Sequence, residues 1–251
     1  MIKEDSRRAA SIRRAALGTA VLALGLLTAA CSQTDADNTT ANFSSDPETA
    51  KIEKVVRSYL LSNPEILEEM IQAREGREMA KAIAPHRKDI ETPFAAAWAG
   101  ARDGDVVLVE FFDYACTYCR ASNPDIAKLL SEDKKLKVVW RELPVLGEGS
   151  LAAANVSLAA AKQGRFKKFH DTLYAEGGPT PDAIAKAQKA AGVAPMQSPE
   201  FMQEIDKNNE LARALGATGT PTWVVGDRIL SGAVGYQALK DAIAEARKRR
   251  A

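Results

Sequence analysis

Apolar and polar positions divide the chain into an N-terminal helical part and a C-terminal part that mixes strands with helices. Residues 106–112 form an apolar run broken by one acid, Glu110, and such a run is typical of a buried strand. A helical pattern follows to about residue 130, and a second apolar run at 136–141 predicts another strand. A crossover helix between the two predicts parallel pairing and a right-handed βαβ unit.

Helical patterns alone fill the segment from 150 to 216, and two strands and a helix follow it. Ser150, Thr180 and Ser198 stand where helix caps are expected, so we expect helices at 150–164, 165–174, 181–192 and 199–216. The short Gly226-Asp227-Arg228 segment predicts a hairpin between strands 222–225 and 229–233. A helix at 236–249 ends the chain. The fold class is therefore α/β.

Residues 46–103 are interpreted as a helical arm and linker. Asp46-Pro47-Glu48 predicts one helix start, and Ser62-Asn63-Pro64-Glu65 predicts another. The second helix should run to about Ala84, where Pro85 would end it. Residues 48–84 carry an apolar stripe that must pack either on its own domain or on a second copy in a homo-oligomer. The sequence does not choose between these alternatives.

The first 45 residues predict export. Residues 1–30 combine a basic start, a short apolar stretch and small residues, as in an export signal. Leu27-Thr28-Ala29-Ala30-Cys31 resembles the site at which bacterial lipoproteins are lipidated on cysteine, although Thr28 departs from it. We expect lipidation of Cys31 and a membrane-anchored protein in the periplasm; ordinary signal cleavage is the alternative. Residues 31–45 are polar and are interpreted as a tether.

Composition excludes several classes of function. A formal net charge of +1 over 251 residues gives no case for a nucleic-acid partner. The chain has three cysteines and two histidines, His86 and His170, which lie far from each other and from the cysteines in sequence. An ordinary Cys₂His₂ zinc site is therefore not expected, and we predict neither a metal nor a cofactor.

Cys116 and Cys119 form a Cys-x-x-Cys pair directly after the strand at 106–112. The first cysteine would lie at a helix N-terminus, where free N–H groups and the helix dipole favour a thiolate. The motif alone is weak evidence, because it also forms half of many zinc sites. Its position after a strand, the proline at 221 directly before another strand, and the acid Glu110 make a redox site the better interpretation.

These segments resemble the DsbA-like thiol–disulfide oxidoreductases of the thioredoxin superfamily. The resemblance rests on residues 111–119 and 219–222 and covers residues 104–251, with the helical block as an insertion in a thioredoxin-like fold. It implies that Cys116 is an exposed nucleophile and that Cys119 resolves the mixed disulfide. It also implies that Glu110 accepts the proton of Cys119. The helices before residue 85 resemble the arm of periplasmic relatives that include oligomeric isomerases and copper-stress proteins.

The same resemblance implies that Pro221 follows a cis peptide bond beside the cysteines and that the Thr220 backbone binds an extended substrate. Thr117 and Tyr118 would set the redox poise. Asp113 would oppose the helix dipole, because a carboxylate close to Cys116 disfavours its thiolate. Expected partners are proteins with cysteines and a membrane redox protein. Oxidation is slightly favoured over isomerisation or reduction, and a Cu(I)-binding stress protein is the less favoured alternative.

Overall fold

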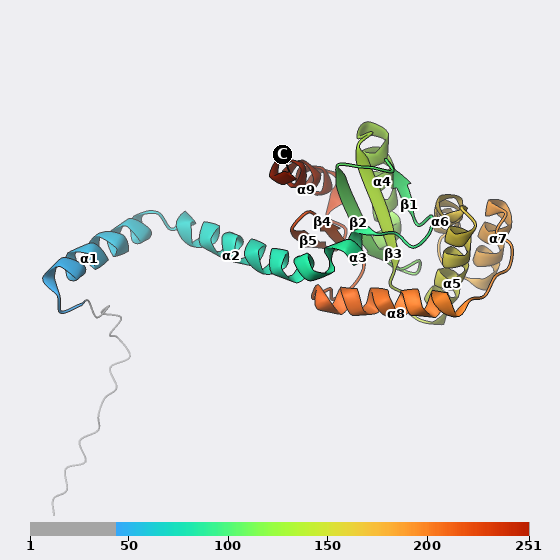
Figure 1. Ribbon diagram of the computed structural model, residues 1–251, viewed down its shortest axis with the longest axis horizontal. Coiled ribbons are helices and arrows are strands. Elements are labelled where there is room, and N and C mark those ends of the chain that lie inside the picture. The colour runs from blue at the N-terminus through green and yellow to red at the C-terminus, as the bar shows by residue number, and fades with distance from the viewer. Residues whose placement is uncertain (1–43, 251) are drawn as a thin grey trace, which may run out of the picture. The chain divides into compact units, whose positions relative to one another are not determined.

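The structure is a computed structural model that describes residues 44–250 (Figure 1). The predicted export signal, most of the tether and Cys31 lie outside the described residues. Contacts divide the described residues into two units with the boundary between Val56 and Arg57, and the larger unit begins at Arg57. Among the described residues, no helix combines the length and the apolar character needed to cross a membrane.

A five-stranded mixed sheet with the order β1-β3-β2-β4-β5 forms the centre of the larger unit. β2 and β3 pair in parallel, with Val106 opposite Leu136 and Glu110 opposite Trp140. The other three pairings are antiparallel. The strands are β1 (Trp98–Gly100), β2 (Val106–Phe112), β3 (Leu136–Glu142), β4 (Thr222–Val225) and β5 (Arg228–Ser231).

Helices precede the sheet, connect its strands and follow it, as Figure 1 shows. The crossover helix between β2 and β3 is α4, and four helices form the insertion between β3 and β4. The helices are α1 (Pro47–Ser62), α2 (Glu65–Ile83), η1 (Ala84–His86), α3 (Arg87–Glu91), α4 (Thr117–Glu132), α5 (Glu148–Lys162), α6 (Phe166–Ala175), α7 (Pro181–Ala191), α8 (Pro199–Ala214) and α9 (Gly235–Arg250).

Every residue of β2 is buried, because both faces of the sheet are covered. Side chains alternate along a strand, so Leu108 and Phe112 enter one core with residues of α4, α5, α6 and α9. Val109 and Phe111 enter a second core with the end of α2, with α3 and with α8. Burial on both faces explains why this strand is apolar at every position except Glu110.

Arg141, on β3, is almost completely buried and joins the sheet to two helices. Its guanidinium donates to the carbonyl of Ile90 at the end of α3 (2.9 Å). It also donates to Asn208 Oδ1 (2.8 Å) and Glu204 Oε1 (3.0 Å) of α8. This network places α3 and α8 against the same face of the sheet and satisfies the buried cation.

The thioredoxin-like fold with its helical insertion is confirmed, as are the parallel βαβ unit and the hairpin. The second arm helix ends before Pro85, as expected, because α2 stops at Ile83 and Pro85 lies in the short η1. Two local expectations were wrong. Ser150 caps no helix, because it lies buried inside α5, whose N-cap is Gly147. The segment interpreted as linker contains β1 and the core residue Ile90.

Candidate active site

Cys116 lies at the junction of the β2–α4 loop with α4, where it is the N-cap residue. Its Sγ accepts a hydrogen bond from the backbone N–H of Cys119 (3.4 Å). The first turn of a helix has free N–H groups and the positive end of the dipole, so this position stabilises a negative sulfur. Both cysteines are free thiols in the structure. The expected placement of Cys116 at a helix N-terminus is therefore observed.

The segment before β4 forms the opposite wall of the site. The peptide bond between Thr220 and Pro221 is cis, as the resemblance implied. The Cys116 thiol lies 3.2 Å from the carbonyl oxygen of Thr220 and donates to it. This loop explains why Cys116 is only 6 % exposed, whereas we expected an exposed nucleophile. Tyr118 and Thr117, between the cysteines, are the exposed residues of the motif.

Glu110 and Cys119 are both buried on the core side of Cys116. Burial raises the pKa of Glu110 well above its ordinary value, and the neighbouring Trp140 side chain opposes this shift only in part. The pKa of the Cys119 thiol is also raised, first by burial and then by the charge of Glu110. A buried acid beside a buried thiol can exchange a proton with it without access to bulk water.

Asp113 organises the loops around the site. One carboxylate oxygen accepts the N–H of Ala115 (2.8 Å). The other accepts the N–H groups of Val145 (2.8 Å) and Leu146 (3.0 Å). The carboxylate therefore holds the loop before Cys116 to the loop after β3. This arrangement gives Asp113 a positioning task that its sequence context did not reveal.

A further group of buried polar side chains lies behind the cysteines, on α5, on α6 and at the ends of β2 and β3. The Tyr114 hydroxyl lies 2.9 Å from Ser157 Oγ and 3.2 Å from His170 Nδ1. Glu142, at the end of β3, is 3 % exposed. Burial lowers the pKa of His170 well below its ordinary value, so this histidine is neutral. None of these four residues was predicted from the sequence to have a role.

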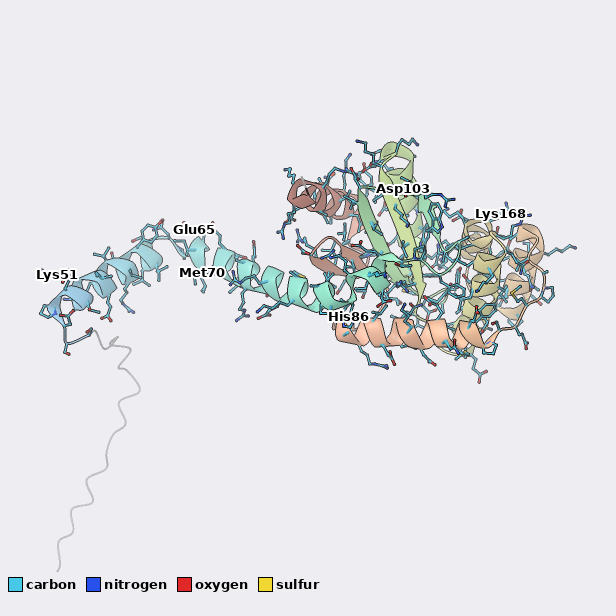
Figure 2. The ribbon with its side chains drawn as sticks, in the orientation of Figure 1. Lys51, Glu65, Met70, His86, Asp103 and Lys168 are labelled. Atoms are coloured by element: carbon cyan, nitrogen blue, oxygen red, sulfur yellow. The ribbon has the colours of Figure 1, made fainter. Side chains whose placement is uncertain are left out.

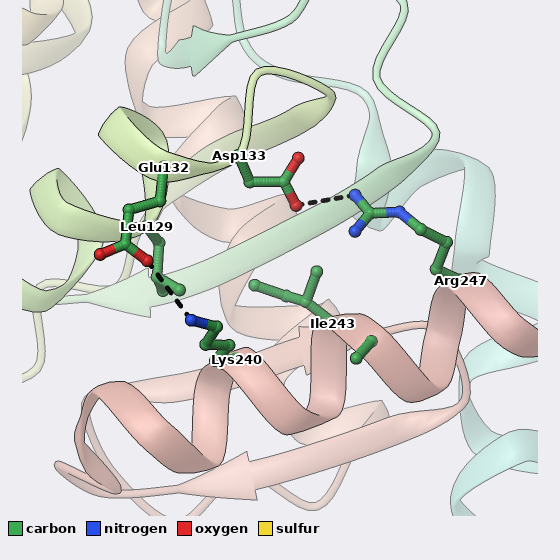
Figure 3. A pocket seen from close by; sticks show the side chains of 7 residues that line it. Leu129, Glu132, Asp133, Lys240, Ile243 and Arg247 are labelled. Carbon is green, nitrogen blue, oxygen red and sulfur yellow. Dashed lines mark hydrogen bonds and ion pairs between the residues drawn. The ribbon is translucent and has the colours of Figure 1, made fainter.

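A well-defined hollow lies between α4 and α9, at the end of α4 away from Cys116 (Figure 3). Its charged side chains are paired with each other: Arg247 contacts Asp133 (2.8 Å), and Lys240 contacts Glu132 (3.4 Å). Leu129 and Ile243 supply its apolar wall. Because the charges are already compensated, this hollow gives no reason to place the chemistry there.

The model of the DsbA-like thioredoxin domain matches residues 107–244, which is more than half of the chain and includes both cysteines and Pro221. The chain belongs to the DsbA-like thioredoxin domain family. The predicted family is thereby confirmed. The model of the N-terminal domain of the copper resistance protein ScsC matches residues 48–81, which coincide with α1 and most of α2.

Solved structures of DsbA-like proteins agree with this assignment. A linker-deletion mutant of ScsC from Proteus mirabilis is 31 % identical, with a TM-score of 0.65, and the match covers 84 % of this chain and 100 % of that one. A thioredoxin-like oxidoreductase from Silicibacter pomeroyi is 37 % identical, with a TM-score of 0.60, over 63 % of this chain and 95 % of that one.

Curated relatives extend the family to longer proteins. The disulfide bond formation protein D of Bacillus subtilis is 26 % identical over 57 % of this chain and 73 % of its own length. The Na(+)/H(+) antiporter NhaA 1 of Salinispora arenicola is 28 % identical over 59 % of this chain and 24 % of its own. The chain thus spans about a quarter of the antiporter relatives, which share this domain-sized segment with it.

Sequence reasoning placed Cys116, Cys119, Glu110, Thr220 and Pro221 in one site, and the structure brings them together. Sequence reasoning missed Glu142. This residue stands at the end of a predicted strand, whereas Glu110 stands inside one. An acid at the end of a strand is most simply interpreted as the first solvated residue after it. Only the packing of α5 and α6 over this end of the sheet makes the position buried.

Proposed function

We propose that the protein is a protein thiol–disulfide oxidoreductase that works through the Cys116–Cys119 pair. The observation that carries the proposal is the placement of the two sulfurs. Cys116 Sγ lies at the N-terminus of α4, facing the Thr220 carbonyl, while Cys119 lies buried beside Glu110. An attacking sulfur at a helix N-terminus and a buried resolving thiol are the two components that the exchange reaction requires.

In the reducing direction, the Cys116 thiolate attacks a substrate disulfide, and one substrate sulfur leaves as a thiolate. Cys119 then gives its proton to the Glu110 carboxylate and attacks Cys116 Sγ. The Cys116–Cys119 bond forms as the bond between Cys116 and the substrate breaks, so the substrate is reduced and the pair is oxidised. The Thr220 backbone would hold the substrate chain in an extended form beside Cys116. The oxidising direction is the reverse of these steps.

The proposed direction is oxidation of substrate proteins. The helix N-terminus and the Cys119 N–H stabilise the Cys116 thiolate, and this stabilises the reduced pair. A stabilised reduced form makes the disulfide form a stronger oxidant. A membrane redox partner would restore the disulfide. Thiol alkylation of the protein taken from its native cell should find the pair mostly oxidised, whereas a mostly reduced pair would indicate an isomerase or reductase.

Insulin reduction tests the exchange activity itself. The wild-type protein with dithiothreitol should accelerate the precipitation of insulin chains, and Cys116→Ser should abolish the acceleration. Cys119→Ser keeps the attacking sulfur and serves as the matched control for folding and for the presence of one thiol. Acceleration by Cys116→Ser equal to that of the wild type would contradict the proposed function.

The proposed location is the periplasm, with Cys31 lipidated and residues 31–45 serving as a tether to the membrane. The basic and apolar start of the chain supports export. A protein from Salmonella enterica that is 31 % identical to this chain is described as a periplasmic thioredoxin-like protein. Disulfide exchange also suits that compartment, because disulfides persist there.

A second copy of the chain is the proposed partner of the arm. Apolar side chains on α1 and α2 are exposed, and Figure 2 labels one of them, Met70, on α2. Exposed apolar surface of this extent usually marks an interaction site. The match of residues 48–81 to the N-terminal domain of ScsC supports a shared role for this arm. The exposed residues are Ile52, Val55, Val56, Tyr59, Leu60, Leu61, Leu67, Met70 and Ile71.

A further inference from the structure

Glu142 is a second buried acid behind the cysteines, and the exchange reaction described above does not use it. Its Oε1 is buried and has no hydrogen-bond partner among the described residues, and the same is true of Glu110 Oε1. A buried carboxyl oxygen without a partner costs stability, so it needs a reason to be there. Two such groups beside one redox pair point to a common task.

The register of the sheet places the two acids on the same face. Glu110 is opposite Trp140, and Glu142 is opposite Phe112, two residues further along the same parallel pair. Side chains two residues apart on a strand point to the same side, so Glu110 and Glu142 are diagonal neighbours. With ideal strand spacing, their Cα atoms are about 8 Å apart. The Oε1 atoms do not bond to each other, but the charge of Glu110 acts on Glu142 across this distance.

The charges that act on Glu142 come from the redox site. Burial is the main cause that raises the pKa of Glu142 well above its ordinary value. A hydrogen bond with Ser157 lowers this pKa, and the negative charges of Asp113 and Glu110 raise it. The other titratable groups around this core are Tyr114, Cys119, neutral His170 and Tyr174. Lys167 is a positive charge near His170 and Trp140, but it forms an ion pair with Asp171 (2.5 Å). A proton is therefore the available means of neutralising one of the two acids.

We propose that Glu142 is a positioning residue that acts through Glu110: only one of the two buried carboxyl groups is ionised at a time, and this coupling sets the pH range in which Glu110 accepts the proton of Cys119. The proposal rests on the proposed function and adds a residue to it. When Cys119 attacks Cys116 in the mixed disulfide, its proton passes to Glu110, and the neighbouring protonated Glu142 keeps the number of buried negative charges at one. The departing thiolate takes a proton from solvent.

The pH profile of the resolving step tests the proposal. The mixed disulfide of Cys116 with glutathione is formed, and the release of glutathione by Cys119 is followed from about pH 4 to about pH 9. In the wild type, the coupling between the two acids spreads the ionisation of Glu110 over two steps, so the profile should be broad. Glu142→Gln leaves Glu110 to ionise alone, so the profile should narrow to a single step, with its midpoint lower by about 0.5 pH unit or more.

A double-mutant cycle provides the matched control. In the Glu110→Gln background, Glu142→Gln should leave the profile unchanged, because the residue acts through Glu110. Equal shifts in both backgrounds would overturn the proposal, as would a Glu142→Gln profile that superimposes on that of the wild type. A merely structural role of Glu142 would change stability without moving the midpoint.

Carboxyl NMR of the wild-type protein keeps the proposal testable if the variants do not fold. In protein labelled with ¹³C at glutamate carboxyl groups, the Glu110 and Glu142 signals should each move in two steps at the same two pH values. A single, independent step for Glu142 near the ordinary value of 4.5 would overturn the proposal. This titration needs no exchange activity. Failure of Cys116 to form the glutathione adduct would instead contradict the proposed function, so the two failures are distinguishable.

Discussion

Glu110 lowers the stability of the folded protein, although the proposed reaction depends on it. It interrupts an otherwise apolar buried strand, and its carboxyl group is desolvated. The folded protein therefore holds the Glu110 proton to a higher pH than the unfolded chain does. Below the ordinary pKa the residue is neutral in both states; as the pH rises through the folded pKa, the charge must be buried, and stability is lost. The proposed proton transfer from Cys119 uses this same buried acid.

Glu110→Gln should therefore stabilise the protein at high pH and leave it nearly unchanged at low pH. Each unit by which the folded pKa exceeds the unfolded one is equivalent to about 1.4 kcal/mol once the pH is above both. For a domain of this size, 1 kcal/mol corresponds to roughly 2–4 °C in Tm. Thermal unfolding at about pH 4 and about pH 8 measures the difference. A Glu110→Gln variant that is less stable than the wild type at the higher pH would contradict the argument that burying the Glu110 carboxylate lowers stability.

At the scale of elements, the sequence predicted those parts of the fold that have a strong local pattern. The strand at β2, the crossover helix α4 and the caps at Thr180 and Ser198 were all visible as apolar runs or cap residues. β1 was not, because three residues that include Gly100 have no alternation to detect. Ser150 was misleading, because a serine inside a buried helix has the same local sequence signal as a cap.

The candidate site shows the same limit. Cys116, Cys119 and Glu110 were found because each stands out within its own segment of sequence. The cis bond before Pro221 was inferred from the resemblance rather than from any local property of the sequence. The burial of Cys116 and the position of Glu142 depend on segments distant in sequence that fold over them, namely the Thr220 loop and α5. Contacts between segments that are distant in sequence cannot be predicted from the local pattern of apolar and polar residues.

The helices of the arm allow a prediction of their own. If α1 and α2 associate with a second copy, replacing exposed apolar side chains by acids should abolish association, because burying an unpaired charge is costly. We expect Val55→Asp combined with Leu67→Asp to convert an oligomer into a monomer in sedimentation velocity. Glu69→Asp, on the same helix as Leu67, is the matched control and should leave the oligomer intact.

Point substitutions are preferable here to removal of everything before Asp103. Such a deletion would also remove Ile83, Ile90 and β1, which contribute to the core and the sheet of the larger unit. A wild-type protein that sediments as a monomer would contradict association through the arm. It would also leave the exposed stripe on α1 and α2 as a surface for a different partner.

The whole molecule combines three parts: a start of the chain that predicts export and anchoring, a helical arm that matches the ScsC N-terminal domain, and a DsbA-like domain with one redox pair. The antiporter relatives, of which this chain spans about a quarter, contain a similar segment within a longer protein. The match to the DsbA-like domain includes both cysteines of the pair, so this domain is where the chemistry should be tested.

Trapping of mixed disulfides tests the central claim most directly. In Cys119→Ser the resolving thiol is missing, so a protein captured by Cys116 should remain attached. Expressed in its native cell and acid-quenched, this variant should give adducts on a non-reducing gel, with Cys116 identified by mass spectrometry as the linked residue. The adducts should disappear on reduction and should be absent from Cys116→Ser. Adducts of equal abundance in Cys116→Ser, or none in Cys119→Ser, would contradict the account.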